Sequence, residues 1–115
     1  MIMFRRPRPE IKCLTRELML LNEHGLHARP ATEFVRCVQM FESTVAITAK
    51  GKRYRADRIM EVLLANLNHG DTFVLEAEGP DAPQAVERIA GLIAFLRKAE
   101  DRAQNFRNPH REVVD

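Results

Sequence analysis

The chain is poor in cysteine and has no long apolar run. Its 115 residues include two cysteines, Cys13 and Cys37, in neither a CxxC nor a zinc-type spacing. A disulfide framework or a structural zinc site is therefore not expected, and two free thiols fit a reducing compartment. No stretch is long and apolar enough for a membrane span, and the first residues do not form a secretory signal. We expect a cytoplasmic protein that does not insert into membranes and uses no metal or other cofactor.

The composition is that of an ordinary folded domain. Apolar residues make up 45% of the chain and charged residues 30%, and its length suits one domain with its own core. Residues 1–14 hold four basic residues and one acidic residue, which gives this segment a net charge of +3. Because the whole chain has a net charge of +2, the remaining residues carry a net charge of −1. A DNA-binding domain is expected to carry its basic residues on a folded face. Nucleic acid is therefore not expected as the main partner.

Hydrophobic periodicity predicts seven elements in the order β-α-β-β-α-β-α. The expected strands cover residues 15–21, 44–49, 52–55 and 71–78. The expected helices cover about 28–40, a short stretch from an Asp57 N-cap to 64, and a last helix after Asp81 that ends near Lys98. Apolar faces that all point one way predict an α+β fold, a two-layer open-faced sandwich. Around this domain, residues 1–14 form a basic arm and residues 99–115 a polar C-terminal extension.

The most informative segment is residues 25–33, GLHARPATE. Pro30 is tolerated in the first turn of a helix, and the apolar spacing that follows predicts a helix facing the core. His27 then stands where free backbone N–H groups and the positive end of the helix dipole converge. With Arg29 beside it, this histidine is well placed to hold a dianion on its imidazole ring.

Gly25-Leu26-His27-Ala28-Arg29-Pro30-Ala31 resembles the active-site motif of HPr, the histidine phosphocarrier of the bacterial phosphoenolpyruvate-dependent sugar phosphotransferase system. Further segments fall where HPr sequences carry like residues, with no gap between His27 and Gly79: Gly51-Lys52, Ile59-Met60, Gly70-Asp71 and Glu76-Ala77-Glu78-Gly79. The resemblance covers about residues 15–98. It implies a four-stranded antiparallel sheet with three helices on one face.

The resemblance also implies a carrier rather than an enzyme. His27 Nδ1 would accept a phosphoryl group from enzyme I and pass it to an enzyme IIA domain. The amides of Ala28 and Arg29 and the Arg29 side chain would hold the phosphoryl oxygens, without a metal. His24 is a possible neighbour of this site, and a metal pair with His27 is not expected because a third ligand is missing nearby.

Partner docking is implied for the short helix that follows residue 58. By spacing alone its apolar residues belong to the core, but the resemblance places Ile59, Met60 and Leu63 at an exposed apolar patch that partners bind. Arg36 matches a basic position that faces acidic partner surfaces.

Two residues depart from the family pattern. Arg58 stands where many Gram-positive members carry a serine that a regulatory kinase modifies, so that regulation is not expected here. Glu61 places a carboxylate inside the expected docking surface. The leading hypothesis is a phosphocarrier. The alternatives are a regulatory paralogue that binds partners in a phosphorylation-dependent way without sugar flux, and a nucleic-acid binder acting through its basic arm.

Strand alternation also predicts the character of the uncovered sheet face. It sends three large apolar residues there: Met19, Leu21 and Val74. An uncovered apolar patch usually marks an interaction surface. We therefore expect this patch to be covered, either by one of the chain's extensions or by a second copy in a homodimer.

Overall fold

The computed structural model describes residues 12–107, with side chains up to Lys98, and has the predicted element order. The elements are β1 (Lys12–Met19), α1 (Ala28–Val38), β2 (Thr44–Ala49), β3 (Lys52–Arg55), α2 (Ile59–Ala65), β4 (Thr72–Gly79) and α3 (Ala82–Arg107). Most of the predicted basic arm and the last residues of the predicted extension lie outside the described residues. Within residues 12–107, no helix has both the length and the apolar character needed to cross a membrane.

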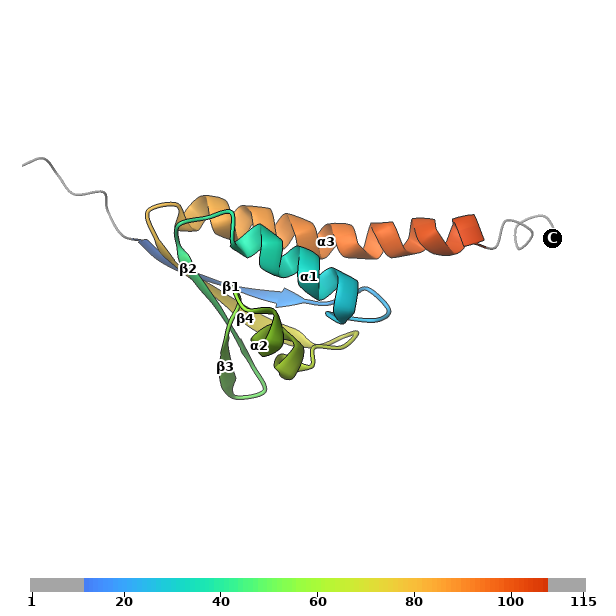
Figure 1. Ribbon diagram of the computed structural model, residues 1–115, viewed down its shortest axis with the longest axis horizontal. Helices are drawn as coiled ribbons and strands as arrows, with labels where there is room; N and C mark the ends of the chain where they lie inside the picture. The colour runs from blue at the N-terminus through green and yellow to red at the C-terminus, as the bar shows by residue number, and fades with distance from the viewer. Residues whose placement is uncertain (1–11, 108–115) are drawn as a thin grey trace, which may run out of the picture.

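The four strands form one antiparallel sheet in the order β1-β4-β2-β3. The central strand β4 pairs with both neighbours, so that Leu75 lies opposite Arg16 of β1 and Ile47 of β2. The three helices cover one face of this sheet, as Figure 1 shows. The predicted fold class is confirmed.

The core lies between the sheet and the helices. The rings of Phe34 on α1 and Phe73 on β4 meet edge to face, with their centroids 6.5 Å apart. Ile47 of β2, Val62 of α2 and Ile89 of α3 are completely buried in the same cluster. The three helices and the two inner strands, β2 and β4, thus contribute the buried residues that their apolar periodicity selects for the inner face.

Several predicted boundaries were wrong. β1 begins at Lys12 rather than at residue 15, because residues 12–14 pair with residues 77–79 of β4. The N-cap of α2 is Arg58, not Asp57, whose carboxylate instead pairs with Arg55 at 2.9 Å. α3 does not end near Lys98 but continues to Arg107, through a segment rich in good helix formers such as alanine, arginine and glutamate.

The uncovered sheet face does not carry the expected apolar patch. Val74 lies between Thr48 and Glu17 in the register, and polar or charged residues occupy most other outward positions. Leu21 lies beyond the end of β1 and lines a depression against α3, so it does not join Val74. The prediction of one contiguous patch was wrong, because Met19 and Leu21 line the depression against α3, which does not include Val74.

Candidate functional site

His27 is the N-cap of α1, with an extended backbone and an exposed side chain. The N–H of Ala31 donates to the carbonyl of His27 at 2.9 Å, and Pro30 has no N–H. The first turn therefore leaves two amides, those of Ala28 and Arg29, without an intrahelical acceptor. Both lie at the positive end of the helix dipole, beside the imidazole, and can bind an anion that the ring carries.

Two loops that are distant in sequence are joined beneath His27. The N–H of Leu26 donates to the carbonyl of Leu67 at 2.9 Å, and both side chains are buried. The N–H of Leu20 donates to the carbonyl of Asp71 at 2.9 Å, which closes the other end of the same contact. The loop that carries His27 is therefore held against the loop that follows α2.

Gly25 permits this close contact between the loops. Its φ of +63° is a conformation that other residues adopt at a cost, and an added Cβ would lie 2.2 Å from the Leu67 carbonyl oxygen. The glycine of the motif is thus required both for its own backbone turn and for the approach of residues 67 and 68.

The ring of His27 contacts a residue that the sequence analysis did not single out. Its Nε2 lies 3.2 Å from Oδ1 of Asn68. The Asn68 side-chain amide donates to the carbonyl of Asn66 at 3.0 Å, and its backbone N–H donates to Asp71 Oδ2 at 2.9 Å. The latter bond, together with the charge of Lys50, lowers the pKa of Asp71. The polar residues of the turn over 66–71 were the signal that could have drawn attention to this position.

The other predicted site residues lie on exposed parts of the same region. Arg29 is exposed in the first turn of α1, one residue after Ala28. His24 is exposed in the loop before Gly25. Among the residues that the structure describes, no three His, Cys, Asp or Glu side chains converge as metal ligands would.

Helix α2 presents an exposed apolar surface, but not with all of the expected residues. Met60 and Leu63 are exposed, whereas Ile59 is partly buried and packs against the core. Leu64, which the sequence analysis missed, is 69% exposed and lies one turn after Met60. The sequence IMEVLLA contains more apolar residues than one helical face can bury, and this was the available signal.

The two departures from the family pattern have different positions. Arg58 is exposed at the N-cap of α2 and places a guanidinium at the position noted above for its missing serine. Glu61 does not place a free carboxylate in the docking surface, contrary to the expectation. Its Oε1 accepts a 2.8 Å hydrogen bond from the backbone N–H of Arg55, so it holds α2 to the end of β3.

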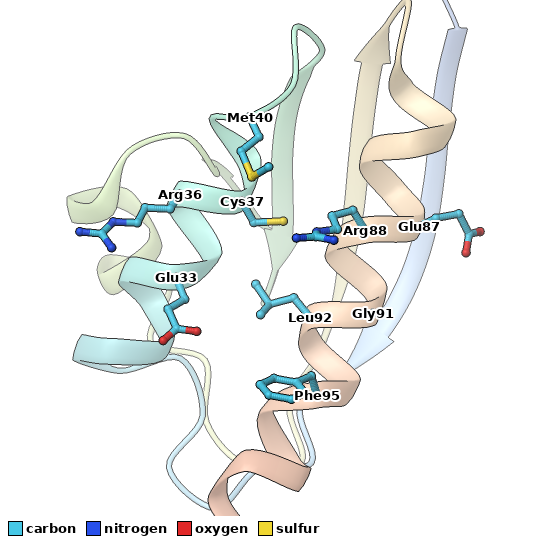
Figure 2. Close-up of a pocket in the computed structure, with 9 residues that line it drawn as sticks. All are labelled: Glu33, Arg36, Cys37, Met40, Glu87, Arg88, Gly91, Leu92 and Phe95. Atoms are coloured by element: carbon cyan, nitrogen blue, oxygen red, sulfur yellow. The ribbon is translucent and has the colours of Figure 1, made fainter.

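A groove of about 520 Å³ lies between α1 and α3, apart from His27 (Figure 2). Arg36, which was predicted to face partners, lines the groove with the aliphatic part of its side chain, while its guanidinium points away from the groove.

The Cys37 thiol, which lines the same groove, points toward Arg88 on the opposite helix. Burial raises the pKa of this thiol, although its hydrogen bond to Arg88 opposes the shift. The thiol is therefore kept in its protonated, poorly nucleophilic form.

Comparison with known proteins adds a family match to this geometry. Residues 14–94 match the family model described as the PTS HPr component phosphorylation site. Phosphocarrier protein HPr of Vibrio cholerae is 32% identical over 81 residues, covering 70% of this chain and 95% of that protein. The multiphosphoryl transfer protein of Escherichia coli O157:H7 is 35% identical over 89 residues, covering 75% of this chain but 24% of that protein. The crystal structure of HPr from Thermoanaerobacter tengcongensis is similar with a TM-score of 0.69 and 31% identity, covering 70% of this chain and 91% of that one.

Proposed function

Because the chain belongs to the HPr family of phosphocarrier proteins, we propose that His27 Nδ1 accepts a phosphoryl group from phosphorylated enzyme I and passes it to an enzyme IIA domain. Members of this family carry a phosphoryl group rather than turn over a free substrate, so the protein is not an enzyme. The observation that carries the proposal is the exposed imidazole of His27 at a helix N-terminus with two unpaired amides. An exposed site suits a group that two different proteins must reach in turn.

In the transfer step, the Nδ1 lone pair of neutral His27 attacks the phosphorus atom carried by the donor histidine. A new N–P bond forms as the donor N–P bond breaks, and the electron pair of the broken bond returns to the donor nitrogen. The amides of Ala28 and Arg29 and the Arg29 guanidinium then face the phosphoryl oxygens and offset their negative charge. The reverse attack by an acceptor histidine returns His27 to its neutral state.

Partner docking is proposed for the surface beside His27. Met60, Leu63 and Leu64 on α2 offer exposed apolar side chains, and methionine adapts readily to different partners. The exposed guanidinium of Arg36 on α1 suits an acidic partner surface. A cytoplasmic location follows for a protein that exchanges phosphoryl groups with enzyme I.

The test is to incubate the protein with phosphoenolpyruvate and enzyme I of the same organism and to map the acid-labile product by mass spectrometry. We expect one phosphoryl group, on His27, that moves to enzyme IIA when that protein is added. His27→Ala must lose the label and the matched His24→Ala variant must keep it. Label that persists in His27→Ala contradicts the assignment.

The second stage of the same experiment separates the carrier from the second candidate, a regulatory paralogue that binds partners in a phosphorylation-dependent way without sugar flux. A protein that accepts the phosphoryl group but passes it to none of the organism's enzyme IIA domains is a regulator and not a carrier. In that case the assignment of His27 stands and the proposed place in sugar transport is wrong.

A further inference from the structure

The contact between Asn68 and His27 determines which ring nitrogen carries hydrogen. The Asn68 side-chain nitrogen donates to the carbonyl of Asn66, so it is the amide oxygen Oδ1 that faces the ring. An amide oxygen can only accept a hydrogen bond. The Nε2 atom 3.2 Å away must therefore be the donor, and in a neutral imidazole the other nitrogen, Nδ1, then holds the free lone pair.

We propose that Asn68 is a positioning residue that holds His27 in the tautomer with hydrogen on Nε2 and so presents the Nδ1 lone pair for phosphoryl transfer. The inference rests on the proposed function of His27 as the phosphoryl acceptor and identifies a residue on which its reactivity depends. Asn68 lies 41 residues away in sequence, outside the histidine motif.

The Asn68 side chain is itself held in place before any phosphoryl donor arrives. Its backbone N–H is bound by the Asp71 carboxylate, and Lys50 Nζ lies 3.5 Å from that carboxylate and donates to the Asn66 carbonyl at 3.1 Å. The bond from Leu26 N–H to the Leu67 carbonyl sets the separation of the two loops. The acceptor of the Nε2–H group is thus preorganised, and supporting contacts of this kind orient a reactive group.

The same contact gains strength during the transfer. Attack by Nδ1 leaves the ring with a positive charge that the Nε2–H group shares, because no proton leaves the ring in this step. The hydrogen bond to the Asn68 oxygen then becomes charge-assisted, and such bonds are about twice as strong as neutral ones. Asn68 therefore stabilises the phosphorylated ring as well as orienting the free one.

The test compares three forms of the full chain: wild type, Asn68→Ala and Asn68→Asp. Two-bond nitrogen–hydrogen NMR correlations of His27 at about pH 9, where imidazole is neutral, report the tautomer directly. We expect hydrogen on Nε2 in the wild type, a larger Nδ1–H population in Asn68→Ala, and retention of the wild-type tautomer in Asn68→Asp, which keeps an acceptor oxygen. Phosphorylation by enzyme I should slow by about threefold to tenfold in Asn68→Ala, the range for one hydrogen bond.

A control variant, Gln84→Ala, removes an exposed amide side chain on α3 and should change neither the tautomer nor the rate. An unchanged tautomer and rate in Asn68→Ala overturn the inference. Equal changes in Asn68→Ala and Asn68→Asp also overturn it, since they would show that Asn68 acts by shaping the loop. The tautomer is measured without enzyme I, so a wild type that shows the expected tautomer but is not phosphorylated refutes the proposed function and not the assignment of the contact.

Discussion

The backbone N–H of Leu26 donates a 2.9 Å hydrogen bond to the carbonyl oxygen of Leu67, and the next residues along the chain are His27 and Asn68. The two leucine side chains are buried in the core, while His27 is exposed above them. The separation of the imidazole and the amide is therefore set by buried backbone contacts. An exposed site can be held rigid in this way without a surrounding pocket.

Gly25→Ala is expected to disrupt this contact. The variant must adopt a φ of +63° and place its Cβ 2.2 Å from the Leu67 carbonyl oxygen and 2.7 Å from Asn68 Cα, so the loops must move apart. Strain of this kind costs about 1–3 kcal/mol, which denaturant unfolding would measure. The matched control is Gly51→Ala, at φ +79° with no atom within 4 Å of the added Cβ. Equal losses in both variants would show that the loop contact contributes nothing.

Arg29→Ala is expected to slow phosphoryl transfer without unfolding the protein. Exposed substitutions usually change stability by less than about 0.5 kcal/mol, whereas a hydrogen bond to a charged group contributes about 1.5–3 kcal/mol. The rate of phosphorylation by enzyme I should therefore fall by about tenfold to a hundredfold. Arg97→Ala, an exposed arginine on α3, serves as the control for loss of positive charge. A normal rate combined with a lowered thermal midpoint would reverse the assignment.

Asp81 should make stability depend on pH in the acid range. Its carboxylate accepts hydrogen bonds from the Ser43 hydroxyl and from the N–H groups of Glu42 and Ser43, which lowers its pKa. Because the folded pKa lies below the unfolded value, the stabilisation is complete above the unfolded pKa and is lost as the pH falls through the folded pKa. Asp81→Asn should therefore lower the thermal midpoint at neutral pH, and the difference from wild type should shrink on acidification. Glu78→Gln, an exposed substitution on β4, should show neither effect.

The two thiols should react at very different rates. Cys13 is exposed on β1, whereas Cys37 is buried on α1 and burial raises its pKa. Because the thiolate is the reactive form, a thiol reagent should modify the native protein at Cys13 and react at least about tenfold more slowly at Cys37. Cys13→Ser should remove the fast phase of the reaction. Unfolding the protein in denaturant should expose the Cys37 thiol and make it react fast. A single fast phase of two thiols would contradict the burial of Cys37.

Much of the fold and the chemistry of the candidate site could be predicted from short segments. Alternating apolar residues predicted β2 at its observed bounds, and the tight turn at Lys50-Gly51 predicted the short return strand β3 after it. Pro30 and the apolar spacing after it located the start of α1, and with it the amides beside His27. These features depend on residues within one or two turns of each other, so the local sequence was sufficient.

Long-range contacts decided what the segments alone left open. Asn68 contacts His27 across 41 residues, and the Glu61 carboxylate is bound by the backbone N–H of Arg55 on β3. Lys12 joins β1 because β4 is long enough to pair with it. The sequence by itself determined the histidine, its helix and the succession of helices and strands along the chain, since local periodicity and turn chemistry specify them. Only the tertiary structure placed an acceptor at the second ring nitrogen, because that distance depends on how two remote loops pack.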